Sequence, residues 1–248
     1  MGAFSLTNEL ATKSLHFKGG TSPQPIISFV FTISCYLNSR SMTEGKQKIG
    51  LLGGSFNPVH SGHLILAQDA MEQAELDEII FIPCAVPAHK DPGSLISFEH
   101  RFSMLELAIE DNPDFSVSEV ENRRNGISYT IDTIRYLKQM HPDAEFHFII
   151  GSDSLPELQS WMKIYELLEE CQFVIMARPG FKASEMTKER INLRDPWPER
   201  LRERVITGHE IEISSTDVRM RVAEGMSIRY LVPAAVEMYI YEHSLFQR

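Results

Sequence analysis

Hydrophobic positions along the chain follow two alternating patterns from about residue 47 onward. Short, nearly continuous apolar runs such as residues 78–83 are typical of strands that are buried on both faces. Longer stretches, in which Phe102, Leu105 and Ile109 recur at helical spacing, are typical of helices. These patterns predict strands at residues 47–53, 78–83, 116–120, 146–150 and 172–177. They predict helices at 64–74, 98–111 and 129–140, and another that opens with the capping box 154–157 and continues through 161–170.

Strands that alternate with helices require crossover connections and indicate a mostly parallel sheet. The predicted fold is therefore α/β: a Rossmann-like, doubly wound, mostly parallel sheet with a small C-terminal helical part. Residues 181–204 are highly charged, contain Pro196 and Pro198, and are expected to run over the surface. Residues 211–214 are expected to form a last short strand, after which Ser215 caps a helix at 216–223. A closing helix is predicted at 233–243, which completes one domain over residues 42–248.

The first 41 residues differ from the rest of the chain. They hold a single acidic residue, Glu9, are rich in Ser and Thr, and contain the apolar run 25–36. That run is too short to span a bilayer. It follows Lys13 and Lys18 as in a signal peptide, but no small-residue cleavage site comes after it. We interpret residues 1–41 as a disordered N-terminal extension or a mis-assigned start upstream of Met42, with a targeting segment as the alternative.

The net charge and the cysteine content limit the classes of protein to which this chain can belong. The formal net charge is −10, which argues against a general nucleic-acid binder, since such a protein presents a basic face. No apolar run is long enough for a membrane helix. The three cysteines are Cys35, Cys84 and Cys171; they are odd in number and scattered, so they imply no disulfide framework. We therefore expect a cytoplasmic protein without nucleic-acid or membrane partners.

The segment 49–64, with the sequence IGLLGGSFNPVHSGHL, combines several features of a phosphate site. A buried strand ends at Gly53 and Gly54, and glycines allow a ligand to approach the backbone closely. A short loop then carries His60, and His63 stands at the mouth of a helix, whose free N–H groups attract phosphate. The alternative is a tight turn with two surface histidines. A zinc site is not favoured, because it needs three or four ligands and only Cys84 and His89 could be added, without ligand-like spacing.

Four further polar segments are expected at the carboxyl ends of strands, where parallel sheets bind ligands. They are 87–90 with Lys90, 125–130 before a helix, 151–153 with Asp153, and 213–219 with three hydroxyl residues and Arg219. Each has a plain structural explanation as a surface cation, a turn, a helix cap or a cap followed by a surface arginine. Trp161 is either a core residue or an aromatic face for a flat ring. Neither the P-loop nor the classical dinucleotide motif is present.

The order of these motifs resembles a known family. The glycine–histidine block is similar to the (H/T)-x-G-H motif of the nucleotidyltransferase superfamily, with Asn57 where many members have Asp. Together with Pro-x-His-Lys, Ser-Tyr-Thr-x-Asp-Thr, Gly-x-Asp…Trp, Ala-Arg-Pro-Gly and Ile-Ser-Ser-Thr-x-x-Arg, it resembles the bacterial nicotinate-nucleotide adenylyltransferases from about residue 48 to the C-terminus. That family transfers AMP from ATP to nicotinate mononucleotide, giving deamido-NAD and pyrophosphate.

The resemblance implies a role for each matching residue. Catalytic groups would be His60, His63, Lys90 and Arg219. ATP would be bound by Gly53, Gly54, Ser55, His60, His63, Gly151, Asp153, Arg178, Ser214, Thr216 and Arg219. Nicotinate mononucleotide would be bound by Lys90, Tyr129, Thr130 and Trp161.

The resemblance also implies Mg²⁺ as cofactor, carried mainly by the ATP phosphates rather than by protein ligands. Two alternatives stay open at this stage. One is another adenylyl- or cytidylyltransferase of the superfamily, with phosphopantetheine or nicotinamide mononucleotide as acceptor. The other is a non-catalytic nucleotide sensor, which loss of His60 or His63 would favour; both histidines are present.

Overall fold

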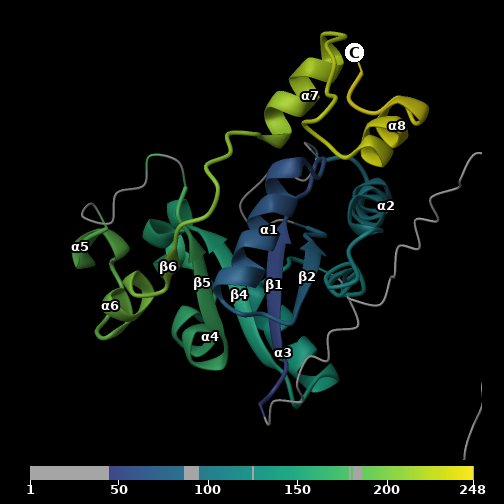
Figure 1. Cartoon of the computed structure of the whole chain (residues 1–248). Helices are drawn as coiled ribbons and strands as arrows, with labels where there is room; N and C mark the ends of the chain where they lie inside the picture. The colour runs from purple at the N-terminus through teal and green to yellow at the C-terminus, as the bar shows by residue number, and fades with distance from the viewer. Residues whose placement is uncertain (1–44, 87–94, 125, 179, 181–185, 248) are drawn as a thin grey trace, which may run out of the picture. The chain divides into compact units, whose positions relative to one another are not determined.

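A parallel six-stranded sheet forms the centre of the computed structural model, which describes residues 45–86, 95–124, 126–178, 180 and 186–247 (Figure 1). The strands are β1 (Lys48–Gly54), β2 (Glu78–Pro83), β3 (Phe115–Val117), β4 (Glu145–Gly151), β5 (Gln172–Met176) and β6 (Val205–Ile206). Their order is β3-β2-β1-β4-β5-β6, and every neighbouring pair is parallel. The predicted doubly wound α/β fold is therefore confirmed. The predicted extension, residues 1–41, lies outside the described residues.

Both faces of the sheet are covered, which explains the continuous apolar runs of its strands. On one face lie α1 (Ser61–Gln73), α2 (Phe98–Ile109), α7 (Ser215–Ala223) and α8 (Ala234–Glu242). On the other lie α3 (Thr130–Met140), the 3₁₀ helix η2 (Ser152–Ser160), α4 (Ile164–Glu170), α5 (Lys188–Ile191) and α6 (Trp197–Arg202). Within β1, Ile49 and Leu51 join the second core and Leu52 joins the first, as alternation along a strand requires.

Two predicted helix starts needed correction. Helix α1 begins at Ser61 with His60 as its N-cap, so His63 lies inside the first turn and not ahead of the helix. Helix α7 begins at Ser215, and its cap is Ser214, whose hydroxyl accepts a hydrogen bond from the backbone N–H of Asp217. The predicted starts of α1 and α7 lie three residues and one residue too late, because apolar spacing marks the buried face of a helix and not its first turn.

The predicted helix 154–170 is two elements. Residues 152–160 form the 3₁₀ helix η2, and Trp161 is extended. Lys163 then adopts the left-handed conformation with φ of 54°, and α4 starts at Ile164. The apolar spacing runs through both elements because Leu155, Leu158 and the buried residues of α4 face the same core.

Two expectations about the C-terminal half were wrong. The described part of 181–204 is not a surface excursion, because α5, α6 and their connection bury Ile191, Leu193, Trp197 and Leu201. Charged residues there occupy the exposed faces of short helices. Residues 211–214 form no strand; the last strand is β6, at Val205–Ile206. The alternation of Ile211 and Ile213 instead marks a segment that packs on α1 and its core.

The sheet is wound in opposite directions from its centre. From β1 the chain moves to β2 and β3 on one side, and from β4 it moves to β5 and β6 on the other. Crossovers that diverge in this way leave a crevice at the carboxyl ends of β1 and β4, which is where open parallel sheets bind ligands.

Candidate active site

The histidine pair stands at this crevice, directly after β1. The backbone N–H of His60 donates to Nδ1 of His63 over 3.2 Å, and the two imidazoles stack with centroids 3.7 Å apart. Because Nδ1 of His63 accepts this bond, the proton of neutral His63 resides on Nε2. The edge of the His63 ring also meets Phe56, at 5.0 Å between centroids. His63 is therefore oriented as a hydrogen-bond donor through Nε2.

Gly62, between the two histidines, leaves room for His60. A Cβ built on Gly62 would lie 3.1 Å from Nδ1 and 3.2 Å from Cε1 of the His60 ring. Those contacts are tighter than most real Cβ contacts, so a side chain at this position would displace the imidazole. The glycine of the His-x-Gly-His motif is thus explained by packing between neighbouring residues.

Burial changes the acid–base behaviour of His60. Its side chain is only 6% exposed, and Nδ1 is a buried atom without a hydrogen-bond partner in the described structure. Burial, with a smaller contribution from the positive charge of Arg178, lowers the pKa of His60 from 6.5 to about 4. In the free protein His60 is consequently a neutral imidazole at physiological pH.

Helix α7 lies beside the start of α1 (Figure 1), and hydrogen bonds join it to the loop that carries the histidines. The hydroxyl of Ser215 donates to the carbonyl of Pro58 over 2.8 Å. Arg219 donates through Nη1 to the carbonyl of Asn57 over 2.8 Å, and through Nη2 to Oγ1 of Thr216 over 3.2 Å. The structure therefore brings Ser214, Thr216 and Arg219 beside the histidine loop, with the N-terminus of α7 at the same edge. Among the described residues, the hydroxyl oxygens of Ser214 and Thr216 each accept one hydrogen bond, so their protons remain for another acceptor.

The end of β4 contributes an exposed charged pair. Asp153 and Arg178 form an ion pair of 3.4 Å between Oδ1 and Nε, and the backbone N–H of Arg178 donates to Oγ of Ser152. A Cβ on Gly151 would clash with Oδ1 of Asp153 and come within 2.8 Å of Nε of Arg178. A side chain larger than glycine would thus disturb both predicted ATP-binding residues. Gly53, Gly54 and Ser55 lie at the end of β1, on the neighbouring strand.

On the other side of β1, the start of α3 faces the same edge of the sheet. Tyr129 is its N-cap, no side chain caps the helix, and Thr130 is the first helical residue. The backbone N–H of Ser128 donates to the carbonyl of Val86, which joins this turn to the segment after β2. Trp161 is half-buried, with its ring edge-on to Phe148 at 6.0 Å. Lys90 lies outside the described residues.

Two buried charged residues of this region were not predicted. Arg101, on α2, is 1% exposed and donates to the carbonyl of Ser55 over 2.9 Å, which holds the end of the glycine loop. Asp69, on α1, is 6% exposed and accepts from both the backbone N–H and Nδ1 of His209, over 2.7 and 2.8 Å. The signal for both in the sequence is a charged residue on an otherwise apolar helix face.

The donors suited to a metal ion are sparse. Within the described ranges, no group of three or more His, Cys, Asp and Glu side chains is arranged to hold an ion.

Nor does any helix in those ranges have the length and apolar character needed to cross a membrane.

Comparison with known proteins agrees with this geometry. A model of the cytidylyltransferase-like family matches residues 51–221. A protein of Lachnoclostridium phytofermentans is 44% identical over 200 residues, covering 81% of this chain and 99% of its own length. A protein of Syntrophotalea carbinolica is 42% identical over 214 residues, covering 81% and 97%. Both carry the name "probable nicotinate-nucleotide adenylyltransferase".

Among solved structures, nicotinic acid mononucleotide adenylyltransferase of Plasmodium falciparum, complexed with NaAD, has the same fold. It covers 81% of this chain and 97% of its own, with a TM-score of 0.65 and 22% identity. A doubly wound sheet with paired histidines and an arginine-bearing helix start at the switch point is the arrangement of a nucleotidyltransferase. The chain belongs to the cytidylyltransferase-like family, in its group of nicotinate-nucleotide adenylyltransferases.

Proposed function

We propose that the protein transfers AMP from ATP to nicotinate mononucleotide, giving deamido-NAD and pyrophosphate, a step in NAD biosynthesis. The observation that carries the proposal is the joining of His60 and His63 to α7 through Arg219 and Ser215 at the switch point. Relatives at 44% and 42% identity that bear this activity in their names support it.

The reaction demands positioning and charge neutralisation rather than a strong base. The 5′-phosphate of the acceptor is already a competent nucleophile, so it attacks the α-phosphorus of ATP directly and pyrophosphate leaves. Negative charge grows on the α-phosphate and on the leaving group. Preorganised donors aimed at those oxygens therefore lower the barrier.

The donors of this site suit that task. We assign the α-phosphate to Nε2 of His63 and to the imidazole of His60, which lie on stacked rings. The triphosphate is assigned to the N–H groups of α7, the hydroxyls of Ser214 and Thr216, and the guanidinium of Arg219. Arg219 is held from behind by the Asn57 carbonyl, so its remaining N–H groups are preorganised. The backbone of the neighbouring residues Gly53, Gly54 and Ser55 is also assigned to ATP. Lys90 is proposed to neutralise the acceptor phosphate.

The edge formed by β4 and β5 is assigned to the nucleoside. The Asp153 carboxylate, beside Gly151, suits the two hydroxyls of the adenosine ribose. Arg178, which forms an ion pair with Asp153, is assigned to the same nucleotide.

The pyridine ring of the acceptor is assigned to the start of α3. N–H groups at the uncapped helix start around Tyr129 and Thr130 suit its carboxylate, which the helix dipole also favours. The nicotinamide form would aim an NH₂ group at the same donors and leave them unpaired, at a cost of about 1–3 kcal/mol each. Trp161 is proposed to stack on the ring, which both forms share.

Mg²⁺ is proposed to enter with the nucleotide. The described residues provide no carboxylate cage, which suits an ion coordinated mainly by phosphate oxygens and water. When bound, it supplies further neutralisation of the triphosphate charge. A cytoplasmic location is also part of the proposal; Cys84 and Cys171 are both free thiols, as a reducing compartment favours.

The proposal is tested by measuring pyrophosphate release from ATP with a panel of acceptors. We expect turnover with nicotinate mononucleotide and a kcat/KM at least tenfold lower with the nicotinamide form. Trp161→Ala should weaken both acceptors and leave their ratio nearly unchanged. Equal kcat/KM values would contradict the pocket at α3, and turnover only with phosphopantetheine would contradict the acceptor class. No turnover with any acceptor, together with ATP binding, would indicate a nucleotide sensor instead.

A further inference from the structure

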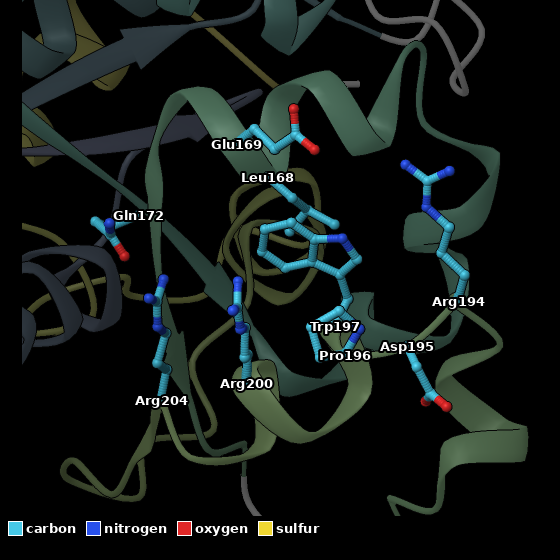
Figure 2. A pocket seen from close by; sticks show the side chains of 9 residues that line it. All are labelled: Leu168, Glu169, Gln172, Arg194, Asp195, Pro196, Trp197, Arg200 and Arg204. Carbon is cyan, nitrogen blue, oxygen red and sulfur yellow. The ribbon is translucent and has the colours of Figure 1, made fainter.

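A cavity, shown in Figure 2, lies where β5 begins, at the edge of the sheet opposite the candidate active site. Its volume is about 500 Å³, and its walls come from the end of α4, the first residue of β5, the region of α6 and the residue before β6. Gln172, on its wall, begins β5, whereas Arg178 follows the other end of that strand. The five residues of β5 span about 17 Å at the usual rise, so the two places are distinct.

Three arginines line this cavity: Arg194, Arg200 and Arg204. Among the residues that the structure describes, none of the three guanidinium groups forms an ion pair. Arg200 lies over the Trp197 ring at 5.3 Å, and Arg194 lies over the Tyr165 ring at 3.9 Å. By contrast, Arg135 on α3 pairs with both Glu166 and Glu170. Among the described residues, the positive charge around the cavity is therefore not neutralised by an ion pair.

The acidic residues of the cavity offset this charge only in part. Asp195 is paired with Lys188 over 3.2 Å, and Figure 2 shows its carboxylate directed away from Arg200 and Arg204. Glu169 is the other acid on the wall. The guanidinium groups of Arg200 and Arg204 run side by side toward the space beside Trp197 in Figure 2. Unpaired arginines gathered in this way are unexpected on a chain with a net charge of −10.

We propose that this cavity binds a pyrophosphate group, free or within a nucleotide. Planar guanidinium groups bind phosphate oxygens in a bidentate manner, and those of Arg200 and Arg204 are directed toward the same space, whereas Arg194 lies on the Tyr165 ring at the far side of Trp197 (Figure 2). The volume is also within the range of small-molecule sites. Trp197 is 9% exposed and carries Arg200 on its ring, so it serves as a wall rather than as a stacking platform for a base.

Calorimetric titration of the full chain with inorganic pyrophosphate tests the proposal. We expect two binding sites per chain, one at the active site and one at the arginine cavity. The double variant Arg200→Gln/Arg204→Gln should retain one site and unchanged turnover. The matched control is Arg202→Gln, an exposed arginine of α6 that does not line the cavity; it should retain two. One site in the wild type, or two in the double variant, would overturn the proposal.

A fluorescence measurement decides the matter if the double variant does not fold. The chain has two tryptophans, so Trp161→Phe leaves Trp197 as the sole reporter. Its emission should change saturably with pyrophosphate, and Arg204→Gln in that background should weaken the response at least tenfold. Response to pyrophosphate alone identifies the free anion, and response also to ATP or the dinucleotide product identifies a nucleotide. Constant Trp197 emission with all three ligands would overturn the proposal.

Discussion

At the scale of single residues, His63 carries the most specific prediction. Its Nδ1 is occupied by the His60 backbone N–H, so Nε2 is the donor that can strengthen its contact as charge develops on phosphate. His63→Ala should lower kcat roughly 10²–10³-fold while changing KM for ATP far less. Steady-state kinetics measure both, and His141→Ala, outside every motif, is the control. A near-wild-type kcat would remove His63 from the mechanism.

The lowered pKa of His60 predicts that the free energy of unfolding depends on pH. Its pKa of about 4 in the folded chain lies below the ordinary 6.5, so the folded state binds fewer protons between these values. The free energy of unfolding should therefore fall as the pH drops from 6.5 to 4, by up to about 3 kcal/mol from this residue, and be unaffected by it above 6.5. Denaturant unfolding of the wild type and His60→Gln measures the difference. A gap between the two proteins that is constant with pH would contradict the assigned burial.

At the scale of elements, the packing of α1 against the segment before α7 positions the proposed triphosphate donors. Asp69 holds this segment through two hydrogen bonds to His209, and a Cβ on Gly208 would clash with Oδ2 of Asp69. Residues 208–213 then lead directly to the Ser214 cap. We therefore regard Asp69 as a positioning residue.

Substitutions of Asp69 should change both the free energy of unfolding and the KM for ATP. Asp69→Ala should lower the free energy of unfolding by about 1–3 kcal/mol, because two donors lose their partner. It should also raise KM for ATP roughly tenfold, equal to about 1.4 kcal/mol, with a smaller effect on kcat. Asp69→Asn keeps an acceptor and should recover most of the KM. The control is Glu72→Ala, an exposed residue of the same helix. An unchanged KM in Asp69→Ala would mean that α7 is held by Ser215 and Arg219 alone.

At the scale of the whole molecule, residues 1–41 are predicted to be dispensable. The first core strand, β1, begins at Lys48, and the core residues that the structure describes all follow it. A protein that starts at Met42 should keep the melting temperature and the kcat/KM of the full chain. Differential scanning calorimetry and the pyrophosphate assay test this. Insolubility of the shorter protein, or a loss of activity with its fold intact, would contradict the prediction.

The class of fold and the main features of the site were determined by local sequence. Periods of apolar residues report which face of each element is buried, and alternating elements leave few ways to wind a sheet. The glycine–histidine block could likewise be predicted from the sequence, because the end of the strand, the loop and the start of the helix are contiguous in the chain. Sequence resemblance supplied the chemical assignment of distant motifs such as Ser214–Arg219.

Only the tertiary structure decided which residues hold those motifs in place. Arg101 on Ser55, Asp69 on His209 and Arg219 on Asn57 are contacts between segments tens of residues or more apart in the chain. No local period encodes such a pairing, because a buried charge is stable only where the fold delivers its partner. The same reason explains the errors at 181–204 and 211–214, whose burial depends on α4 and α1. The charge and the apolar alternation of a segment are properties of its own sequence, whereas its burial depends on the elements that pack against it in the folded protein.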